Sequence, residues 1–151
     1  MKWLIQDDKI IFSPEFNELL NPELLSRYQT LIFSNYELND NFPNKLSFCD
    51  NKFNQSVDNL PNSIINLTFG SNFNQPVDNL PNSIINLTFG WKFNQPVDNL
   101  PNSVINLTFG SDFNQTMKKL PQNLKKIIFQ NRNYYLEKIK CQTKHIEIIY
   151  E

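Results

Sequence analysis

The sequence FNQPVDNLPNSIINLTFG at residues 73–90 recurs at residues 93–110 with one change, Ile84 to Val104. Further copies begin at Phe53 and Phe113, the last of them degenerate, so four copies follow one another at a period of 20 residues. Self-similarity at a fixed period of this length is typical of a solenoid, in which each repeat stacks on the next. The sequence therefore predicts one repeat domain with rows of equivalent side chains, an arrangement that suits binding along a surface.

Each copy contains the pattern of one short strand. Leu67-Thr68-Phe69 alternates apolar and polar residues with period two, as a half-buried strand does. Turn residues follow at Gly70-Ser71-Asn72, and Asp78-Asn79-Leu80-Pro81 forms a second corner. The Pro, Gly, Asn, Asp and Ser content of each copy disfavours a helix. We therefore expect a β-rich solenoid with one parallel sheet of short strands.

Stacking at the strand spacing of ~4.8 Å aligns equivalent residues into rows. One polar row should be a buried asparagine ladder that satisfies turn backbone groups in its own and adjacent layers, the alternative being a ladder of ligand-binding amides. Three apolar rows should point inward. They are Leu67, Leu87, Leu107 and Ile127; Phe69, Phe89, Phe109 and Phe129; and Phe53, Phe73, Phe93 and Phe113. The ladder is Asn54, Asn74, Asn94 and Asn114.

Shorter echoes of the repeat extend upstream. Ile10-x-Phe12-x-x-x-Phe16-Asn17 keeps the spacing of the full copies, so the solenoid should begin near residue 9 with Trp3-Leu4-Ile5 as a capping strand. Leu31-x-Phe33 and Leu46-x-Phe48 are weaker echoes.

The two ends should be capped. Ser13-Pro14 and Asn21-Pro22 each place an N-cap residue before a proline, which predicts one or two short helices there. At the other end, His145–Tyr150 has the pattern of a last strand.

The motif L-P-x-S-I-x-x-L-x-F-G-x-x-F-N-Q-P-V, which runs from Leu60 to Val77, resembles the FNIP repeat. That family is known chiefly from social amoebae and from giant viruses of amoebae, and an Asn-, Ile-, Phe- and Lys-rich composition agrees with such AT-rich genomes. The resemblance covers about residues 42–130. We expect residues 1–41 to form an N-terminal cap with degenerate repeats and residues 131–151 a C-terminal cap.

FNIP repeats in turn look like leucine-rich repeats, and the spacing Leu60-Pro61-x-x-Ile64-x-x-Leu67-x-Phe69 follows that family. The resemblance therefore implies a leucine-rich-repeat-like solenoid with a period of about 20 residues. A leucine-rich repeat carries its ladder asparagine three residues after Phe69. Here position 72 varies between copies while Phe73-Asn74 is fixed, so the turn after the strand should differ.

Several function classes find no support in the sequence. The net charge of −1 argues against general nucleic-acid binding. The chain shows no P-loop, G-x-G-x-x-G or C-x-x-C motif, and His145 is its only histidine, so we expect a structural role for His145, no cofactor, no metal site and no enzyme. Cys49 and Cys141 lie at opposite ends of the array and are read as free thiols of a reducing compartment.

No secretory signal opens the sequence and no apolar run approaches ~18 residues. We therefore expect a cytoplasmic protein that contacts no membrane, in the host cytoplasm if the gene is viral.

Two groups of charged residues, an aspartate row and a basic C-terminal region, each allow two interpretations. Asp58, Asp78 and Asp98 should each cap their own turn, and the alternative is calcium binding. The region after residue 114 carries eight Lys and Arg against three acidic residues, which suits either an acidic partner or a solvated end face. The basic residues are Lys118, Lys119, Lys125, Lys126, Arg132, Lys138, Lys140 and Lys144.

The positions that differ between copies are the candidates for recognition. The pair before each repeat Phe varies in size and charge, so it should face solvent. Trp91 is the largest member; it is either a protein-binding hot spot or an aromatic lying over the next turn. The strand face is a second candidate, for a protein or a glycan. The candidate residues are Trp91, Lys92, Asn72 and Asp112 in the turns, and Asn66, Asn86, Asn106, Thr68, Thr88 and Thr108 on the strands.

From these observations we expect a non-enzymatic, monomeric protein-interaction module with a protein partner, a host protein if the gene is viral. One alternative is a substrate-recognition subunit of a ubiquitin ligase, because some family members carry an F-box and residues 14–20 faintly resemble an F-box opening. The other alternative is a carbohydrate-binding solenoid.

Overall fold

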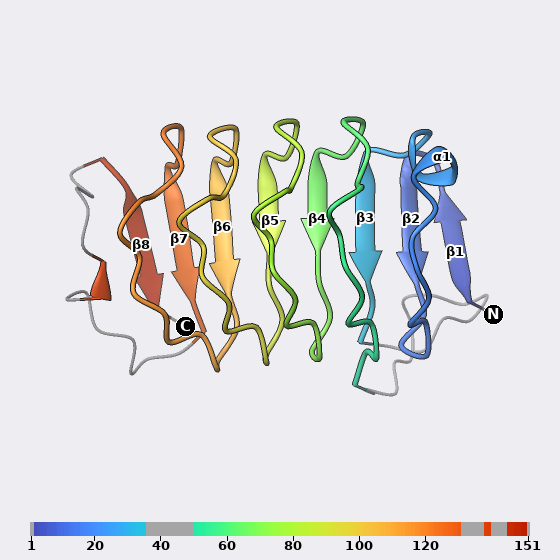
Figure 1. Ribbon diagram of the computed structural model, residues 1–151, viewed down its shortest axis with the longest axis horizontal. Helices are drawn as coiled ribbons and strands as arrows, with labels where there is room; N and C mark the ends of the chain where they lie inside the picture. The colour runs from blue at the N-terminus through green and yellow to red at the C-terminus, as the bar shows by residue number, and fades with distance from the viewer. Residues whose placement is uncertain (1, 36–49, 131–137, 140–144, 151) are drawn as a thin grey trace.

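The computed structural model describes residues 2–35, 50–130, 138–139 and 145–150. It contains a single sheet of eight short strands whose spatial order follows the chain (Figure 1). The strands are β1 (Trp3–Gln6), β2 (Lys9–Phe12), β3 (Thr30–Phe33), β4 (Asn66–Thr68), β5 (Asn86–Thr88), β6 (Asn106–Phe109), β7 (Lys126–Phe129) and β8 (Glu147–Tyr150). The described residues also contain one short helix, α1 (Pro22–Leu25). The predicted β-rich solenoid with one mainly parallel sheet is confirmed.

The register places equivalent repeat residues side by side. Leu67 pairs with Leu87, Leu87 with Leu107, and Leu107 with Ile127. The offset between paired residues is 20 in these steps and 21 at the ends, as in Lys9 with Thr30 and Lys126 with Glu147. One repeat therefore forms one layer, which consists of one strand and one return segment, the stretch of chain that leads from the end of that strand to the start of the next.

One step departs from this period. Thr30 of β3 pairs directly with Asn66 of β4, although 36 residues separate them. The expected echo Leu46-x-Phe48 falls in this interval and lies outside the described residues. The sheet nevertheless continues from β3 to β4, and Phe33 stacks on Phe53 at a ring-centroid distance of 3.9 Å.

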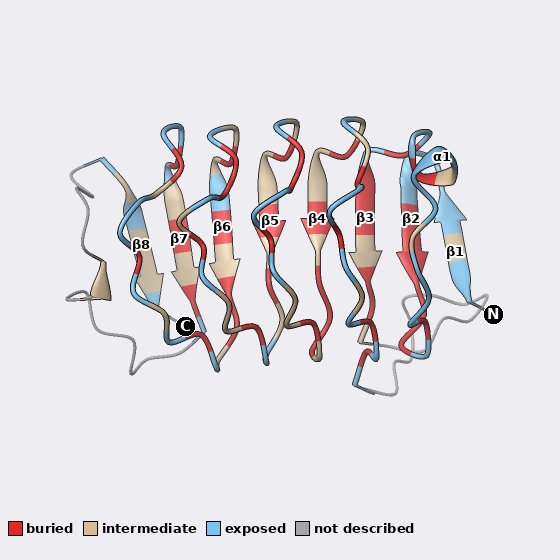
Figure 2. Cartoon of the chain, in the orientation of Figure 1, coloured by how far each residue is buried: buried red, intermediate tan, exposed pale blue. Residues whose placement is uncertain are grey.

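The core lies between the sheet and the return segments, which all cross the same face of the sheet (Figure 1). Buried residues occur both in the strands and in the return segments, as Figure 2 shows. All three predicted inward rows are buried, each member at no more than 2% exposure. The return segments add a further set of buried residues: Val57, Val77, Val97, Met117, Ile64, Ile84, Val104 and Leu124.

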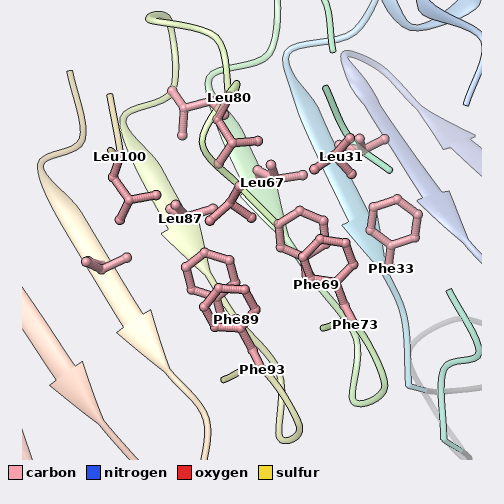
Figure 3. Packing of buried hydrophobic residues seen from close by; sticks show 14 of the residues in the cluster. Leu31, Phe33, Leu67, Phe69, Phe73, Leu80, Leu87, Phe89, Phe93 and Leu100 are labelled. Atoms are coloured by element: carbon pink, nitrogen blue, oxygen red, sulfur yellow. The ribbon is translucent and has the colours of Figure 1, made fainter. Parts of the chain in front are cut away.

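Two of these rows form a continuous stack of phenylalanine rings (Figure 3). Within one layer, Phe69 of the strand end and Phe73 of the turn lie with ring centroids 3.7 Å apart and planes at 6°. Between layers, Phe69 lies 5.6 Å from Phe89, and Phe73 lies 6.1 Å from Phe93. Each ring therefore contacts rings on both sides, which supplies burial that a single repeat lacks.

The repeat glycines mark the closest approach of neighbouring layers. A Cβ atom added to Gly90 would lie 2.2 Å from the carbonyl oxygen of Gly70, and one added to Gly110 would lie equally close to that of Gly90. No positive φ is recorded for these glycines. Their role is to admit the backbone of the layer beside them.

The N-terminal end has the expected cap. β1 pairs antiparallel with β2, and Trp3 packs edge-on against Phe12 and Phe16. Asn21 caps α1, with its Oδ1 accepting from the backbone N–H of Glu23 at 3.0 Å and of Leu24 at 3.2 Å. Residues 14 and 15 form a turn rather than a second helix. The predicted first layer, last strand and short helical cap are thus present.

Among the residues that the structure describes, no helix is long and apolar enough to cross a membrane.

Candidate functional site

The pairs of residues that precede the repeat phenylalanines lie along one edge of the solenoid, which we call the turn edge. It consists of Asn51-Lys52, Ser71-Asn72, Trp91-Lys92 and Ser111-Asp112. The prediction that these pairs face solvent is right for Lys52, Trp91, Lys92 and Asp112, which are exposed.

The same prediction is wrong for Asn51 and Ser71, which are 0% and 4% exposed. Asn51 Nδ2 donates to the carbonyl oxygens of Ser34 at 2.8 Å and Ser13 at 3.3 Å, and Ser71 Oγ donates to Asn35 Oδ1 at 2.9 Å. Small polar side chains are tolerated at these buried positions because each finds hydrogen-bond partners, some of them in the preceding layer.

Trp91 is the exposed aromatic of the turn edge, with 57% of its surface accessible. Its indole Nε1 donates to Oδ1 of Asp112 at 2.9 Å, and the backbone N–H of Asp112 donates to the carbonyl oxygen of Trp91 at 3.0 Å. The ring is therefore tied to the turn of the next layer and is still more than half open to solvent. The contact with the next turn agrees with the interpretation of an aromatic lying over that turn, and the protein-binding hot spot stays a prediction.

The lysines of the turn edge bond to the preceding layer, whereas Trp91 bonds to the next one. Lys92 Nζ donates to Oδ1 of Asn72 at 2.5 Å, and Asn72 Nδ2 donates to the carbonyl oxygen of Asn51 at 2.7 Å. Lys52 Nζ lies 2.5 Å from Oε2 of Glu15. Polar side chains of neighbouring layers thus contact each other all along this edge.

The predicted asparagine ladder is confirmed beside the turn edge. Each Oδ1 accepts the backbone N–H of the equivalent residue in the next layer: Asn54 from Asn74 at 2.8 Å, Asn74 from Asn94 at 2.9 Å, and Asn94 from Asn114 at 2.9 Å. Asn17 extends the ladder by accepting from Asn54 at 3.0 Å. The expectation of a buried ladder is wrong, because Asn54 and Asn114 are exposed and Asn74 and Asn94 are half-buried. The turn that carries them lies at the surface, and only their Phe neighbours reach the core.

The strand face carries a second ladder that the sequence reasoning missed. Asn66 Nδ2 donates to Thr30 Oγ1 at 3.0 Å, Asn86 to Asn66 Oδ1 at 2.6 Å, and Asn106 to Asn86 Oδ1 at 2.7 Å. The identical asparagine at the start of three strands was the available signal. Half-buried Thr68, Thr88 and Thr108 lie next to this ladder. The amides of this candidate surface are therefore largely engaged with each other.

The aspartate row has partners in the neighbouring layer as well as in its own turn. Asp58 Oδ2 accepts from Ser56 Oγ at 2.8 Å within its turn. Asp58 Oδ1 accepts from Asn79 at 3.2 Å and Asp78 Oδ1 from Asn99 at 3.0 Å, both in the next layer. Asp98 Oδ1 accepts the backbone N–H of Lys118 at 2.7 Å. The expectation that each aspartate caps its own turn is therefore wrong for Asp78 and Asp98, because Pro76 and Pro96 replace the serine whose hydroxyl bonds Asp58.

The remaining sequence candidates are His145, a metal site, the two cysteines and the basic residues of the C-terminal region. His145 is exposed and lines a wide hollow with Lys125 and Ile105. The described residues contain no group of three or more His, Cys, Asp or Glu side chains that would hold a metal ion. Cys49, Cys141, Arg132, Lys140 and Lys144 lie outside the described residues.

Comparison with known proteins agrees with this geometry. The FNIP repeat profile matches residues 53–90, 76–112 and 93–132, which together span more than half of the chain. A search of curated proteins found no match. Among solved structures, this fold is similar to the giant-virus protein CroV588, described as a novel circular leucine-rich-repeat protein, with 28% identity and a TM-score of 0.54.

That similarity covers 99% of this chain and 31% of CroV588, so the chain spans about a third of that protein's length. The residues that the profile matches contain the repeated L-P-x-S-I and F-N-Q segments. The chain belongs to the FNIP repeat family and has its leucine-rich-repeat-like solenoid fold.

Proposed function

We propose that this chain is a non-catalytic protein-interaction module whose turn edge around Trp91 contacts a partner protein. One observation carries the proposal. The same layer is built with Ser71 on one side and Ser111 on the other, so the fold does not require a tryptophan at this position. A tryptophan that remains 57% exposed on such a scaffold is available for recognition.

The surroundings of Trp91 support this use. The hydrogen bond to Asp112 restrains the indole before any partner arrives, which lowers the entropy lost on binding. Lys92 and Asp112 flank the ring with opposite charges, and flanking charges favour a correctly oriented encounter. Aromatic residues with charged neighbours are enriched among the residues that dominate binding energy.

The other two functions receive less support from the contacts. A glycan-binding strand face would draw on Asn66, Asn86 and Asn106, whose amides already bond to each other. A ubiquitin-ligase receptor would place its adaptor contact in residues 13–30. That segment instead supplies Phe16, Leu25 and Tyr28 to the solenoid core.

The proposal is tested by quantitative affinity capture from host-cell lysate with wild-type chain and the Trp91→Ala variant. Leu19→Ala is the matched control, because Leu19 is another exposed apolar residue, at 77%, and lies beside Ser56, Val57 and Leu60 rather than in the turn edge. We expect Trp91→Ala to lose the proteins that wild type and Leu19→Ala both retain. Equal recovery by all three chains would reject the Trp91 surface.

A further inference from the structure

A shallow groove lies beside the turn edge. It has a volume of about 570 Å³ and is lined by Asn17, Lys52, Asn54, Asn72, Asn74 and Lys92. Lys92 lines the groove and directly follows Trp91 in the chain, so the groove adjoins the part of the turn edge that contains Trp91. Every lining residue is polar, and none of them is acidic.

The asparagine ladder fixes what this groove presents. Oδ1 of Asn17, Asn54 and Asn74 each accepts a backbone N–H of the next layer, at 3.0, 2.8 and 2.9 Å. An N–H group requires an oxygen, so these amides are prevented from flipping, and each NH₂ group lies away from the ladder bond. No acceptor for these three Nδ2 groups is recorded within the described part of the chain. The row therefore offers the groove one amide hydrogen-bond donor group per layer.

The two lysines add ammonium donors to the same groove. Lys92 bonds to the neutral Asn72, so its charge is uncompensated there. Lys52 pairs with Glu15, but both side chains are more than half exposed, at 58% and 71%, and such a pair exchanges readily with a competing carboxylate. Asp112, the other nearby acid, is engaged by the indole of Trp91. Acceptors are thus scarce and donors abundant.

We propose that this groove binds an extended segment of the partner protein that carries acidic side chains, with carboxylates at Lys52 and Lys92 and carbonyl oxygens at the amide row. The proposal rests on the proposed function and gives its partner a chemistry. Carboxylate oxygens accept hydrogen bonds from ammonium groups about twice as strongly as neutral acceptors do. Amide donors spaced ~4.8 Å apart suit a ligand that extends along the layers.

A protein segment fits this groove better than a polyanion does. Only two ammonium groups line it, and residues 1–114 hold twelve acidic residues against six basic ones. A polymer with one negative charge per unit would be repelled by the rest of this surface. A peptide with a few carboxylates and many neutral carbonyl groups matches a surface that has few charges and many donors.

The test uses the isosteric change of asparagine to aspartate. In the Asn54→Asp/Asn74→Asp variant, each carboxylate still accepts the backbone N–H of the next layer, so the ladder and the melting temperature should persist. The NH₂ groups become negatively charged acceptors. The matched control is Asn94→Asp/Asn114→Asp, which alters net charge equally at ladder positions that do not line the groove.

The probe is a fluorescein-labelled eight-residue peptide of alternating Glu and Ser, measured by fluorescence anisotropy at low salt. We expect wild type and the control variant to bind it with similar Kd values, and both Asn54→Asp/Asn74→Asp and Lys92→Gln to weaken binding by about tenfold or more. A Gln-Ser peptide should bind more weakly than the Glu-Ser peptide.

Four outcomes would overturn the inference: no binding of the Glu-Ser peptide to wild type, equal binding of the Gln-Ser peptide, unchanged binding by Asn54→Asp/Asn74→Asp, or tighter binding of polygalacturonate. The affinity capture from lysate distinguishes a failure of the acidic-segment inference from a failure of the proposed function. If Trp91→Ala loses its partners while the groove variant keeps them, the Trp91 surface stands and the acidic-segment inference falls.

Discussion

At the residue scale, single atoms decide how closely the layers approach. Gly70, Gly90 and Gly110 occupy the points where a Cβ atom has no room, and the ladder asparagines satisfy backbone N–H groups that otherwise point into the gap between turns. Packing distance at the glycines and hydrogen bonding at the asparagines are therefore sufficient to explain the sequence identity of the copies at these positions. The variable residues between them are free to differ.

The first prediction concerns Gly90. The added methyl group of Gly90→Ala would lie 2.2 Å from the Gly70 carbonyl oxygen, which belongs to backbone rather than to a flexible side chain. The two layers must separate, and we expect a loss of about 1–3 kcal/mol in the free energy of unfolding. Urea denaturation measures it. Asn82→Ala, an exposed change in a turn of the same repeat, is the control; equal stability of both variants would contradict the close contact.

The second prediction concerns the ladder. In Asn74→Leu the backbone N–H of Asn94 loses its acceptor, while Asn74→Asp retains one. Because the site is half-buried and water reaches part of it, we expect a cost of about 0.5–1.5 kcal/mol for leucine and little change for aspartate. Thermal denaturation of the two variants distinguishes them. A larger loss for aspartate than for leucine would show that the hydrogen bond is not what this position supplies.

At the scale of elements, a strand and its return segment form one layer, and neither is stable alone. The repeat strands β4 to β7 bury only one or two side chains each. The return segment adds the second phenylalanine of each pair, which lies 3.7 Å from the strand phenylalanine in the two central layers. The double row of rings is therefore the element that joins strand to coil and layer to layer.

The third prediction tests that double row. Phe93 is fully buried and contacts Phe73, Phe89 and Phe113. Phe93→Ala removes a ring from the middle of the stack, and we expect a loss of about 3–5 kcal/mol. Trp91→Ala, two residues away but mostly exposed, should cost less than about 1 kcal/mol. Guanidinium denaturation compares the two, and the reverse order would refute the assignment of the core.

At the scale of the whole molecule, stability accumulates along one direction. Each layer contacts only the layers beside it, so the central strands are supported on both sides and the end strands on one. β1 and β8 form the two ends of the sheet, and their side chains are more exposed than those of β3 to β7. Local opening should begin at these ends.

The fourth prediction follows from this one-dimensional stack. Hydrogen–deuterium exchange followed by mass spectrometry should show the slowest amide exchange in β4 to β6 and faster exchange in β1 and β8, after correction for intrinsic rates. Uniform protection across the sheet would indicate a single cooperative unit. Faster exchange in β5 than in β8 would contradict support from both sides.

The amino-acid sequence by itself determined the period, the inward rows and the position of the asparagine ladder. These features are repeated along the chain, and the strand pattern Leu-Thr-Phe states which side chains point inward. The capping strand at Trp3 and the last strand before Tyr150 were predictable for the same local reason.

Only the tertiary structure decided how the turns are arranged. Asn51 and Ser71 are buried, the asparagine ladder is half-buried or exposed, and Asp78 bonds to Asn99 rather than within its own turn. The second ladder on the strands and the direct pairing of β3 with β4 across 36 residues are equally invisible in the local pattern. In each case the partner lies a whole layer or more away along the chain, and turns lack the alternation that tells inside from outside. Stacking of layers supplies those partners, and stacking also leaves Trp91 exposed on the turn edge.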